Sequence, residues 1–497
     1  MTRRRSPVGA HLAAAAICAF TGAAAAADGD APIPWPGGSP PDDVTFTALV
    51  DDAMVIGRRE LADEAVAAIE PPEEHEHMTV YQDTVDQGTF TNADLFRRGD
   101  AFFSHEFTSG EGYGNGPDRR LRRVHDGVRG GLDSHSCAGC HTVGGLDGAG
   151  SETQRAFLEG DGDRTSSAVV RNAPQVIGAG VLQALAFEMT LELQRLRDGA
   201  IASAKSGSAA VRAVLLVRGI DFGAITAKPD GSIDASEVKG LSPDLVVRPF
   251  GWKGTVARAR RFSEDAARVH FGIQSTVLAS GYQTHPDPLH LGPGPNWFDP
   301  DNDGVARELE EGTLTASSVY MTMLESPVIM PPFDAGLRAR WARGSVKFDE
   351  IGCAGCHTRE IPLYATDWRE QSDSTNGTPV AVKIFLDGEF PKTGPGVKLF
   401  SDLRRHDMGA GLADTHDTSD GVPRSVFLTR PLWGLADSAP YMHDGRAATI
   451  PEAILAHGGE AQRARDAFAA LPNEAQIDLH VFLLSLSRAQ KPRLVVK

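Results

Sequence analysis

The sequence predicts a mainly α-helical fold in two similarly organised halves joined by long loops. One pentapeptide, Cys-Ala-Gly-Cys-His, stands at 137–141 and again at 353–357. Amphipathic helical patterns precede both copies, over 95–107 and over 337–348. A last segment, 473–487, carries apolar residues at helical spacing and closes the chain. We therefore expect helices to frame each pentapeptide, with a loop rich in proline and glycine between the halves.

The first 27 residues predict a secretory signal peptide. They contain three early arginines, then a short apolar run, and end in an alanine tract, which is the order of such a signal. A membrane anchor is the less favoured interpretation because the apolar run is short and rich in alanine, and no other stretch is long and apolar enough to cross a membrane. Cleavage after the tract would discard Cys18 and export the chain to the periplasm.

After this cleavage, the four remaining cysteines all lie in the two pentapeptides. Cys-x-x-Cys-His is the attachment signature of c-type haem. The two thiols add to the haem vinyl groups, and the adjacent imidazole becomes the proximal iron ligand. A thioredoxin-like redox pair is the alternative for Cys-x-x-Cys, but it explains neither the histidines nor the lack of other cysteines. The sequence thus predicts two covalently bound haems c, held by Cys137, Cys140 and His141, and by Cys353, Cys356 and His357.

The order of helix, attachment motif, wrapping loops and closing helix is typical of a cytochrome c-like domain. We therefore expect a mainly α fold with two cytochrome c-like haem domains, long connecting loops and an N-terminal extension. A chain of 497 residues is long enough for two or three domains. The predicted boundaries are a signal peptide (1–27), an N-terminal extension (28–94), a first haem domain (95–290), a linker (291–330) and a second haem domain (331–497).

The predicted linker contains a match to the twelve-residue calcium loop D-x-D-x-D-G-x5-E. Carboxylates at alternate positions, a glycine for the sharp turn, a carbonyl at position seven and a closing bidentate carboxylate are the hard oxygen ligands that Ca²⁺ takes. The alternative is a polar linker that matches by chance, with Ala306 where a larger apolar residue is usual. The candidate ligands are Asp299, Asp301, Asp303, Val305 and Glu310.

The net charge is strongly negative, −17 for the whole chain and −20 after loss of the three signal arginines. Such a surface does not suit nucleic acid or anionic lipid and favours a basic electron-transfer partner. A charge that only keeps an exported protein soluble is an equal alternative. We expect a small redox partner protein of the cytochrome or cupredoxin type, no nucleic acid, and no stable membrane insertion.

Function depends on what lies across each iron from its proximal histidine. An iron with protein ligands on both faces transfers electrons, whereas an open face binds a small molecule. For the second haem, Met408, Met442 and His457 follow the attachment motif. A capping box at Thr449 and a glycine at 458 predict a short helix that ends at His457. Spacing alone does not choose between His457 and Met408.

Five segments carry a family resemblance: RNAP, RPFGWKG, SDLRRHDMGAGLAD, RPLWGLADSAPYMHDGRAATIPEAILAHGGEAQ and the closing helix. Together they resemble the bacterial di-haem oxidoreductase family. Members of this family are often labelled thiol oxidoreductases, and the family resembles the di-haem cytochrome c peroxidases. The resemblance covers about residues 95–490 and is densest in the last hundred. Nothing supports the thiol label, because no free cysteine remains.

The resemblance implies that His457 takes the place of the peroxidases' distal methionine, so that the second haem has two histidine ligands. Met408 becomes the second choice. It also implies that Arg446 pairs with a haem propionate, with a purely structural turn as an equal alternative. For the first haem, the peroxidases carry a displaceable histidine after the attachment motif, and this chain has none from Thr142 to Arg171.

Two interpretations of the first haem follow. We favour a permanently open iron that binds hydrogen peroxide; the alternative is a cap by an upstream histidine, His105, His125 or His135. In the open case, Glu188 or Glu152 is the candidate general acid–base that moves a proton to the leaving oxygen. The predicted function is an exported di-haem peroxidase-like oxidoreductase with a second, electron-transfer haem. The alternatives are a non-enzymatic di-haem electron-transfer cytochrome with both irons six-coordinate, and a calcium-stabilised cytochrome that transfers electrons only in a complex.

Overall fold

The computed structural model describes residues of the compact unit that begins at Ala48. The predicted signal peptide and most of the predicted N-terminal extension lie outside the described residues. Within the described part of the chain, no helix is both long enough and apolar enough to span a membrane. The described residues are 79–114, 133–158, 166, 168–281, 299, 301, 303–384 and 396–488, without 146, 152, 366, 375 and 376.

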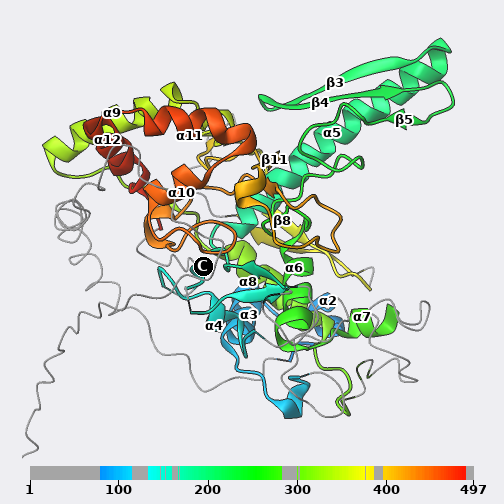
Figure 1. Cartoon of the computed structure of the whole chain (residues 1–497). Helices are drawn as coiled ribbons and strands as arrows, with labels where there is room; N and C mark the ends of the chain where they lie inside the picture. Colours follow the sequence, from blue (N-terminus) through cyan, green and yellow to red (C-terminus); the bar gives the residue numbers. More distant parts are fainter. Residues whose placement is uncertain are drawn as a thin grey trace, which may run out of the picture. The chain divides into compact units, whose positions relative to one another are not determined.

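Eleven α-helices occur in this described part (Figure 1). The helices expected over 95–107, 337–348 and 473–487 correspond to α3, α9 and α12, with ends that differ by a few residues. The helices are α2 (Gln82–Asp86), α3 (Asn92–Ser104), α4 (Cys137–Cys140), α5 (Ala179–Gly207), α6 (Ala259–Ala266), α7 (Thr276–Gly281), α8 (Glu311–Met323), α9 (Ala335–Glu350), α10 (Ile450–Ala456), α11 (Gln462–Ala469) and α12 (Asn473–Leu483).

The prediction of a mainly α fold is wrong, because the described residues also form thirteen strands in six small antiparallel sheets. The long connections between helices fold back on themselves, and pairing satisfies backbone groups that burial would otherwise leave without partners. The division into two haem domains is not shown and stays a prediction. The strands are β1 (Ala156–Leu158), β2 (Val169–Arg171), β3 (Val211–Val217), β4 (Ile220–Ala227), β5 (Ile233–Asp234), β6 (Val328–Ile329), β7 (Ile361–Pro362), β8 (Asp367–Glu370), β9 (Val380–Lys383), β10 (Gly396–Val397), β11 (Arg405–Asp407), β12 (Val426–Leu428) and β13 (Leu486–Ser487).

The largest sheet, β3–β4–β5, packs against the long helix α5 (Figure 1). Its first hairpin follows from the sequence: Leu215 and Val217 are buried while Val214 and Leu216 are exposed, the alternation of a half-buried strand. A two-residue turn with positive φ at both positions joins β3 to β4, as the twist of such hairpins requires. This alternation is the sequence signal that an all-helical interpretation overlooks.

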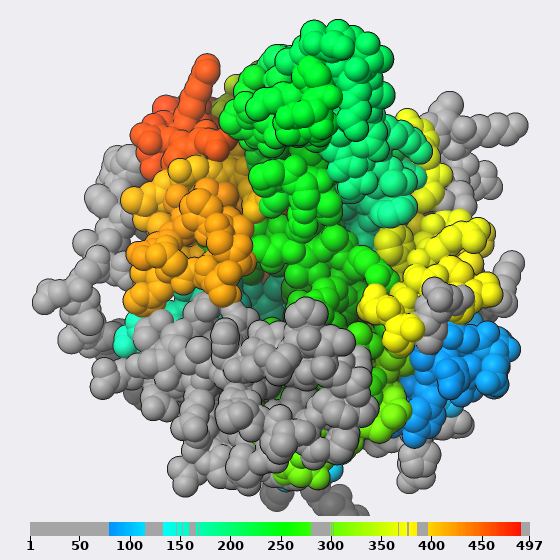
Figure 2. All heavy atoms as spheres, turned by 90° about the vertical axis from the view of Figure 1, so that its right-hand side faces the viewer, coloured from blue at the N-terminus to red at the C-terminus, as the bar shows by residue number. Residues whose placement is uncertain are grey.

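α5 also joins this sheet to the later part of the chain. Phe187 on α5 packs edge-on against Trp368 on β8, with ring centroids 5.8 Å apart. Arg218, in the turn between β3 and β4, forms an ion pair with Glu188 and donates to the carbonyl of Pro362. Figure 2 shows this face, with the green surface of α5 and its sheet beside the yellow surface that includes β8 and β9.

The helices α3, α6 and α8 form the core around the first pentapeptide. α3 begins in a capping box, in which Thr91 and Asp94 satisfy each other's backbone N–H groups. Gly99 lets α3 approach α8 closely, since a β-carbon there would lie 2.6 Å from that of Tyr320. Tyr320 and Phe103 pack together at the centre of this contact, with ring centroids 5.5 Å apart.

The helices α9 and α12 form the core around the second pentapeptide. Gly344 allows their backbones to meet, because a β-carbon would collide with the carbonyl of Asp478. Phe348, Phe400 and Phe482 pack edge-to-face, with centroids 5.5 to 6.0 Å apart. The strand β13, which follows α12, pairs with β6, so the end of the described chain returns to the segment before α9.

Candidate haem sites and cation site

The first pentapeptide forms a single helical turn, α4. Ser136 caps the turn by accepting a hydrogen bond from the Gly139 N–H at 3.0 Å. The His141 N–H closes it on the carbonyl of Cys137 at 3.1 Å. Cys137 and Cys140 are not joined in a disulfide, and burial raises the pKa of the Cys137 thiol to about 12. A short turn with two reduced thiols and a following histidine is what covalent haem attachment requires.

The second pentapeptide forms a 3₁₀ turn over Cys353–Gly355. Gly352 precedes it at φ 97°, a conformation that favours glycine. The His357 N–H again closes the turn on the first cysteine's carbonyl, at 2.9 Å. Cys353 and Cys356 are likewise not joined in a disulfide. Burial raises the pKa of the Cys353 thiol to about 11. The two attachment sites therefore repeat one local arrangement.

Both proximal-ligand candidates have a fixed tautomer. His141 Nδ1 lies 3.1 Å from the carbonyl of Gly148, and His357 Nδ1 lies 2.9 Å from the carbonyl of Phe400. A carbonyl only accepts hydrogen bonds, so Nδ1 carries the proton and Nε2 keeps the lone pair that a metal takes. Burial lowers the pKa of each imidazole to about 4, so both are neutral at physiological pH. The residues present therefore fit haem iron.

His457 lies across from His357, with ring centroids 6.5 Å apart. It ends α10, whose capping box joins Thr449 and Glu452, as the sequence predicts. Its Nδ1 bonds the carbonyl of Ala453 at 2.7 Å, which again leaves Nε2 unprotonated, and burial lowers its pKa. Two metal–nitrogen bonds of about 2 Å plus the two ring radii would separate imidazole centroids by about 6 Å. The observed spacing fits one iron between the two rings.

Of the other residues predicted beside the second haem, Met408 lies against the residue that follows His457, and Arg446 has protein partners of its own. The backbone of Met408 lies against Gly458, since a β-carbon on the glycine would be 2.9 Å from the Met408 carbonyl. Arg446 forms an ion pair with Asp444 at 2.7 Å and donates to the carbonyl of Gly411 at 2.6 Å. Its guanidinium is therefore already engaged by the protein, which fits the structural-turn alternative.

The first site has a different environment. The ring contact of His141 among the described residues is with Phe103, at 5.7 Å between centroids, and no imidazole faces it as His457 faces His357. His105 pairs with Glu111 at 2.7 Å, and His135 stacks on Tyr113 at 4.3 Å. The third candidate, His125, lies outside the described residues.

Of the two predicted acid–base residues, Glu188 lies among the described residues. Glu188 pairs with Arg218 at 2.7 Å and accepts the Tyr364 N–H at 3.1 Å, so it belongs to the contact between α5, β3–β4 and the chain after β7. Glu152 lies outside the described residues. Sequence reasoning missed His270, which pairs with Asp133 beside the first pentapeptide. No spacing signal links His270 to that motif, because the two are brought together only by folding.

The predicted calcium loop brings its three aspartates together. Carboxylate oxygens of Asp299, Asp301 and Asp303 lie within 4.8 Å of one another, and all three residues are buried. The loop bends as the motif requires, with Gly304 at φ 92° and the Val305 N–H donating to Asp303 at 2.7 Å. This convergence of buried like charges fits a cation.

The closing carboxylate of the motif, Glu310, has a partner of its own. It is paired through both oxygens with Arg307, at 2.7 and 2.8 Å, and precedes α8. Glu308, which is partly buried, lies near the aspartates: burial and the charge of Asp301 raise its pKa well above the usual range. The neighbouring Gln274 is buried, donates its N–H to Glu308, and has a side-chain oxygen without a hydrogen-bond partner among the described residues. Glu308 and Gln274 are thus the added candidate ligands.

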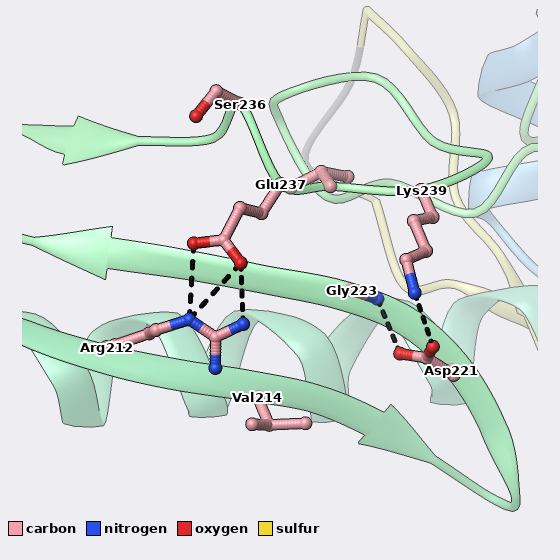
Figure 3. Close-up of a pocket in the computed structure, with 8 residues that line it drawn as sticks. Arg212, Val214, Asp221, Gly223, Ser236, Glu237 and Lys239 are labelled. Carbon is pink, nitrogen blue, oxygen red and sulfur yellow. Dashed lines mark hydrogen bonds and ion pairs between the residues drawn. The ribbon is translucent and has the colours of Figure 1, made fainter.

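A separate pocket of about 440 Å³ lies on the β3–β4–β5 sheet, apart from both pentapeptides (Figure 3). Its charged side chains are already paired across the sheet, Arg212 with Glu237 at 2.6 Å and Lys239 with Asp221 at 2.8 Å. These pairs neutralise the lining, so the pocket offers no unpaired charge to a ligand.

A family-level similarity covers the second attachment site. Residues 322–486 match a family model described as "Di-haem oxidoreductase, putative peroxidase". Among curated proteins, none matches the chain. A MauG-like protein associated with microbial copper homeostasis is similar over 53% of this chain and 78% of its own, at 16% identity and a TM-score of 0.26. Hydrazine synthase of Kuenenia stuttgartiensis is similar over 41% and 66%, at 19% identity and a TM-score of 0.22. The family match confirms, over residues 322–486, the resemblance to the di-haem oxidoreductase family, and it supports a di-haem redox protein.

Proposed function

We propose that this chain is an exported di-haem c-type cytochrome with peroxidase-like activity. One observation carries the proposal. The two attachment sites share their local structure, but the residues opposite their histidines differ. His357 has a second imidazole at 6.5 Å between centroids, whereas His141 has none among the described residues. A six-ligand site suits electron transfer and an open site suits binding of a small molecule. The haems would supply an iron that binds peroxide at the first site and stores electrons at the second.

The chain's own residues hold and orient these groups. The pairs Cys137 and Cys140, and Cys353 and Cys356, would form the thioethers. The carbonyls that bind Nδ1 of each proximal histidine fix the ring orientation and raise the basicity of Nε2. His457 would complete the second site. Its carbonyl partner sits in the preceding turn of α10, so the helix itself positions the ligand.

Trp433 is the candidate electron path between the sites. It is buried, and its indole N–H donates to the carbonyl of Lys398 at 2.8 Å, two residues before the Phe400 carbonyl that binds His357. Its own carbonyl accepts a hydrogen bond from Gln175. That residue precedes Val176, whose N–H binds the carbonyl of Asp147 in the loop after the first pentapeptide. Trp433 thus bridges the segments that support the two histidines, through its indole N–H on one side and its backbone carbonyl on the other.

The net charge supports a class of electron donor, and the N-terminal pattern supports a compartment. The net charge of −17 favours a basic docking face on a small redox protein, and the N-terminal pattern supports export to the periplasm. The buried aspartates and Glu308 support a calcium ion that stabilises the segment before α8. Neither feature identifies the donor.

The direct test is peroxide turnover by the purified protein carrying both haems. We expect reduced small cytochrome to be oxidised in proportion to added hydrogen peroxide, two electrons for each molecule. The variant His457→Gly should lose most of this activity, because the electron-transfer site loses a ligand. Oxidation of the cytochrome by the protein without any peroxide consumption would instead favour the non-enzymatic electron-transfer alternative.

A further inference from the structure

His270 and Asp133 form a histidine–carboxylate pair outside the predicted site. His270 Nδ1 lies 2.9 Å from Asp133 Oδ2, and the Asp133 side chain is 2% exposed. The carboxylate accepts, so Nδ1 carries the proton and Nε2 keeps its lone pair. Nε2 has no hydrogen-bond partner among the described residues. The pair therefore presents one oriented, available imidazole nitrogen.

The backbone around His270 is unusual. It lies in a single π-helical turn, Ala267–Phe271, which continues α6 and ends at Gly272 with φ 78°. π turns in helices are rare and occur frequently at functional sites. The Asp133 N–H donates to the carbonyl of His270 at 3.3 Å, so the two residues are joined through the backbone as well as through their side chains.

This turn packs against the first attachment segment. Phe271 stacks on Phe107 at 5.5 Å between centroids, and the Phe107 N–H donates to the carbonyl of His135, two residues before the pentapeptide begins. Cys137 packs on the apolar cluster that contains both phenylalanines. The electrostatic influence of His270 also reaches His141, whose pKa is lowered first by burial and further by His270. Asp133 and the π turn that carries His270 thus lie beside the first attachment segment.

We infer that His270 is the acid–base residue of the first haem pocket and that Asp133 is its positioning residue. This inference rests on the proposed peroxidase-like function and names the residue that moves the proton. His270 Nε2 takes the proton from one peroxide oxygen and returns it to the other, which leaves as water when the O–O bond breaks. With two electrons from the small redox protein and two protons from solvent, each peroxide becomes two waters. Asp133 keeps the proton on Nδ1 and stabilises the imidazolium that forms between the two transfers.

The geometry favours this role over iron ligation by His270. The rings of His141 and His270 are not in contact as the rings of His357 and His457 are. A residue that transfers protons to a bound peroxide must leave room for it between the iron and the imidazole. Glu188, the sequence-based candidate, is committed to Arg218 and meets no residue of the first pentapeptide.

The test uses the protein loaded with both haems and the variants His270→Gln, His270→Ala and Asp133→Asn. We would measure the rate of reaction with peroxide and, separately, the rate of cyanide binding to the ferric protein, because hydrogen cyanide must lose a proton to bind. His270→Gln should slow the peroxide reaction by about 10²- to 10⁴-fold and slow cyanide binding at least about tenfold. His105→Gln, which breaks the other nearby histidine–carboxylate pair, and the surface variant His416→Gln should stay within about twofold of the parent for both rates.

Each outcome of these measurements either supports or overturns the inference about His270. Unchanged cyanide binding in both His270 variants, or loss of binding in His105→Gln instead, would overturn the inference. A high-spin ferric signal that appears only after His270 is replaced would show an iron ligand rather than an acid–base residue. If the parent protein binds cyanide quickly and does not react with peroxide, the proposed function fails, and the cyanide rates of the variants still test the place of His270.

Discussion

The two attachment segments begin alike and then differ. Each holds its histidine with a backbone carbonyl on Nδ1, at 3.1 Å for His141 and 2.9 Å for His357, and each histidine is partly buried and neutral. His357 faces His457, whose Nδ1 also binds a backbone carbonyl. His141 instead contacts the ring of Phe103. One local sequence thus lies in two environments, because the segments that fold over it are different.

The largest expected effect tests whether the two sites are independent. Replacing both cysteines of one pentapeptide by alanine removes its thioethers, so the haem content should fall from two per chain to one. The matched pair of variants is Cys137→Ala with Cys140→Ala, and Cys353→Ala with Cys356→Ala. Covalent haem would be counted by its absorbance after denaturation. Two covalent haems in either variant would contradict the assignment.

The next effect concerns the ligand at the second site. His457→Met should raise the reduction potential of one haem by on the order of 0.1 V, because axial ligands set haem potentials over about 0.8 V and methionine raises them. Met408→Leu is the matched control and should leave both potentials unchanged. Potentiometric titration measures them. A shift in the Met408 variant alone would move the ligand assignment to Met408.

A third prediction uses a buried carboxyl that distinguishes the sites. At the second site, buried Asp402 is paired with His406 at 2.8 Å. At the first, burial raises the pKa of Asp147 from 3.8 to about 6, although Tyr320 donates to it at 2.6 Å. The folded state therefore binds more protons than the unfolded state between these values. The free energy of unfolding falls by about 3 kcal/mol in total as pH rises from well below 4 to well above 6, and about 2 kcal/mol of this fall lies between pH 4 and 6.

The variant Asp147→Asn should lose this fall, because asparagine does not titrate and still accepts from Tyr320. Urea unfolding of the haem-loaded protein at several pH values measures it, with the parent protein as reference. An equally steep fall in the variant would mean that another group is responsible.

The smallest effect concerns the cation loop. Calcium at 100 times its dissociation constant should add about 2.7 kcal/mol to the free energy of unfolding, read as a rise in the thermal midpoint that a chelator reverses. Glu308→Gln should weaken this response, and Glu310→Gln should not, since Glu310 is held by Arg307. A weaker calcium response in Glu310→Gln than in Glu308→Gln would instead favour the ligand set that the sequence motif predicts.

The sequence predicts the local chemistry better than the fold. The Cys-x-x-Cys-His turns, the capping box at Thr449 and the converging aspartates depend on neighbours within a few residues, so their patterns are readable. The strands of the connections depend on pairing partners that spacing does not reveal, and the alternation over 211–217 is the one readable signal among them.

Contacts between distant segments explain what the sequence could not predict. His270 and Asp133 stand 137 positions apart and meet only because α6 packs beside the first pentapeptide. Near the aspartates, Arg307 pairs with the predicted ligand Glu310, whereas burial and the charge of Asp301 raise the pKa of Glu308. A motif specifies ligand types, but packing decides which carboxylate is available.

The most direct test of the asymmetry is the low-temperature EPR spectrum of the ferric protein carrying both haems. We predict one low-spin signal, from the site of His357 and His457, and one high-spin signal, from the site of His141. In His457→Gly, both sites should become high-spin. Two low-spin signals in the fully ferric parent protein, with the haem that stays ferric after half-reduction still low-spin, would contradict the account and make this chain an electron carrier.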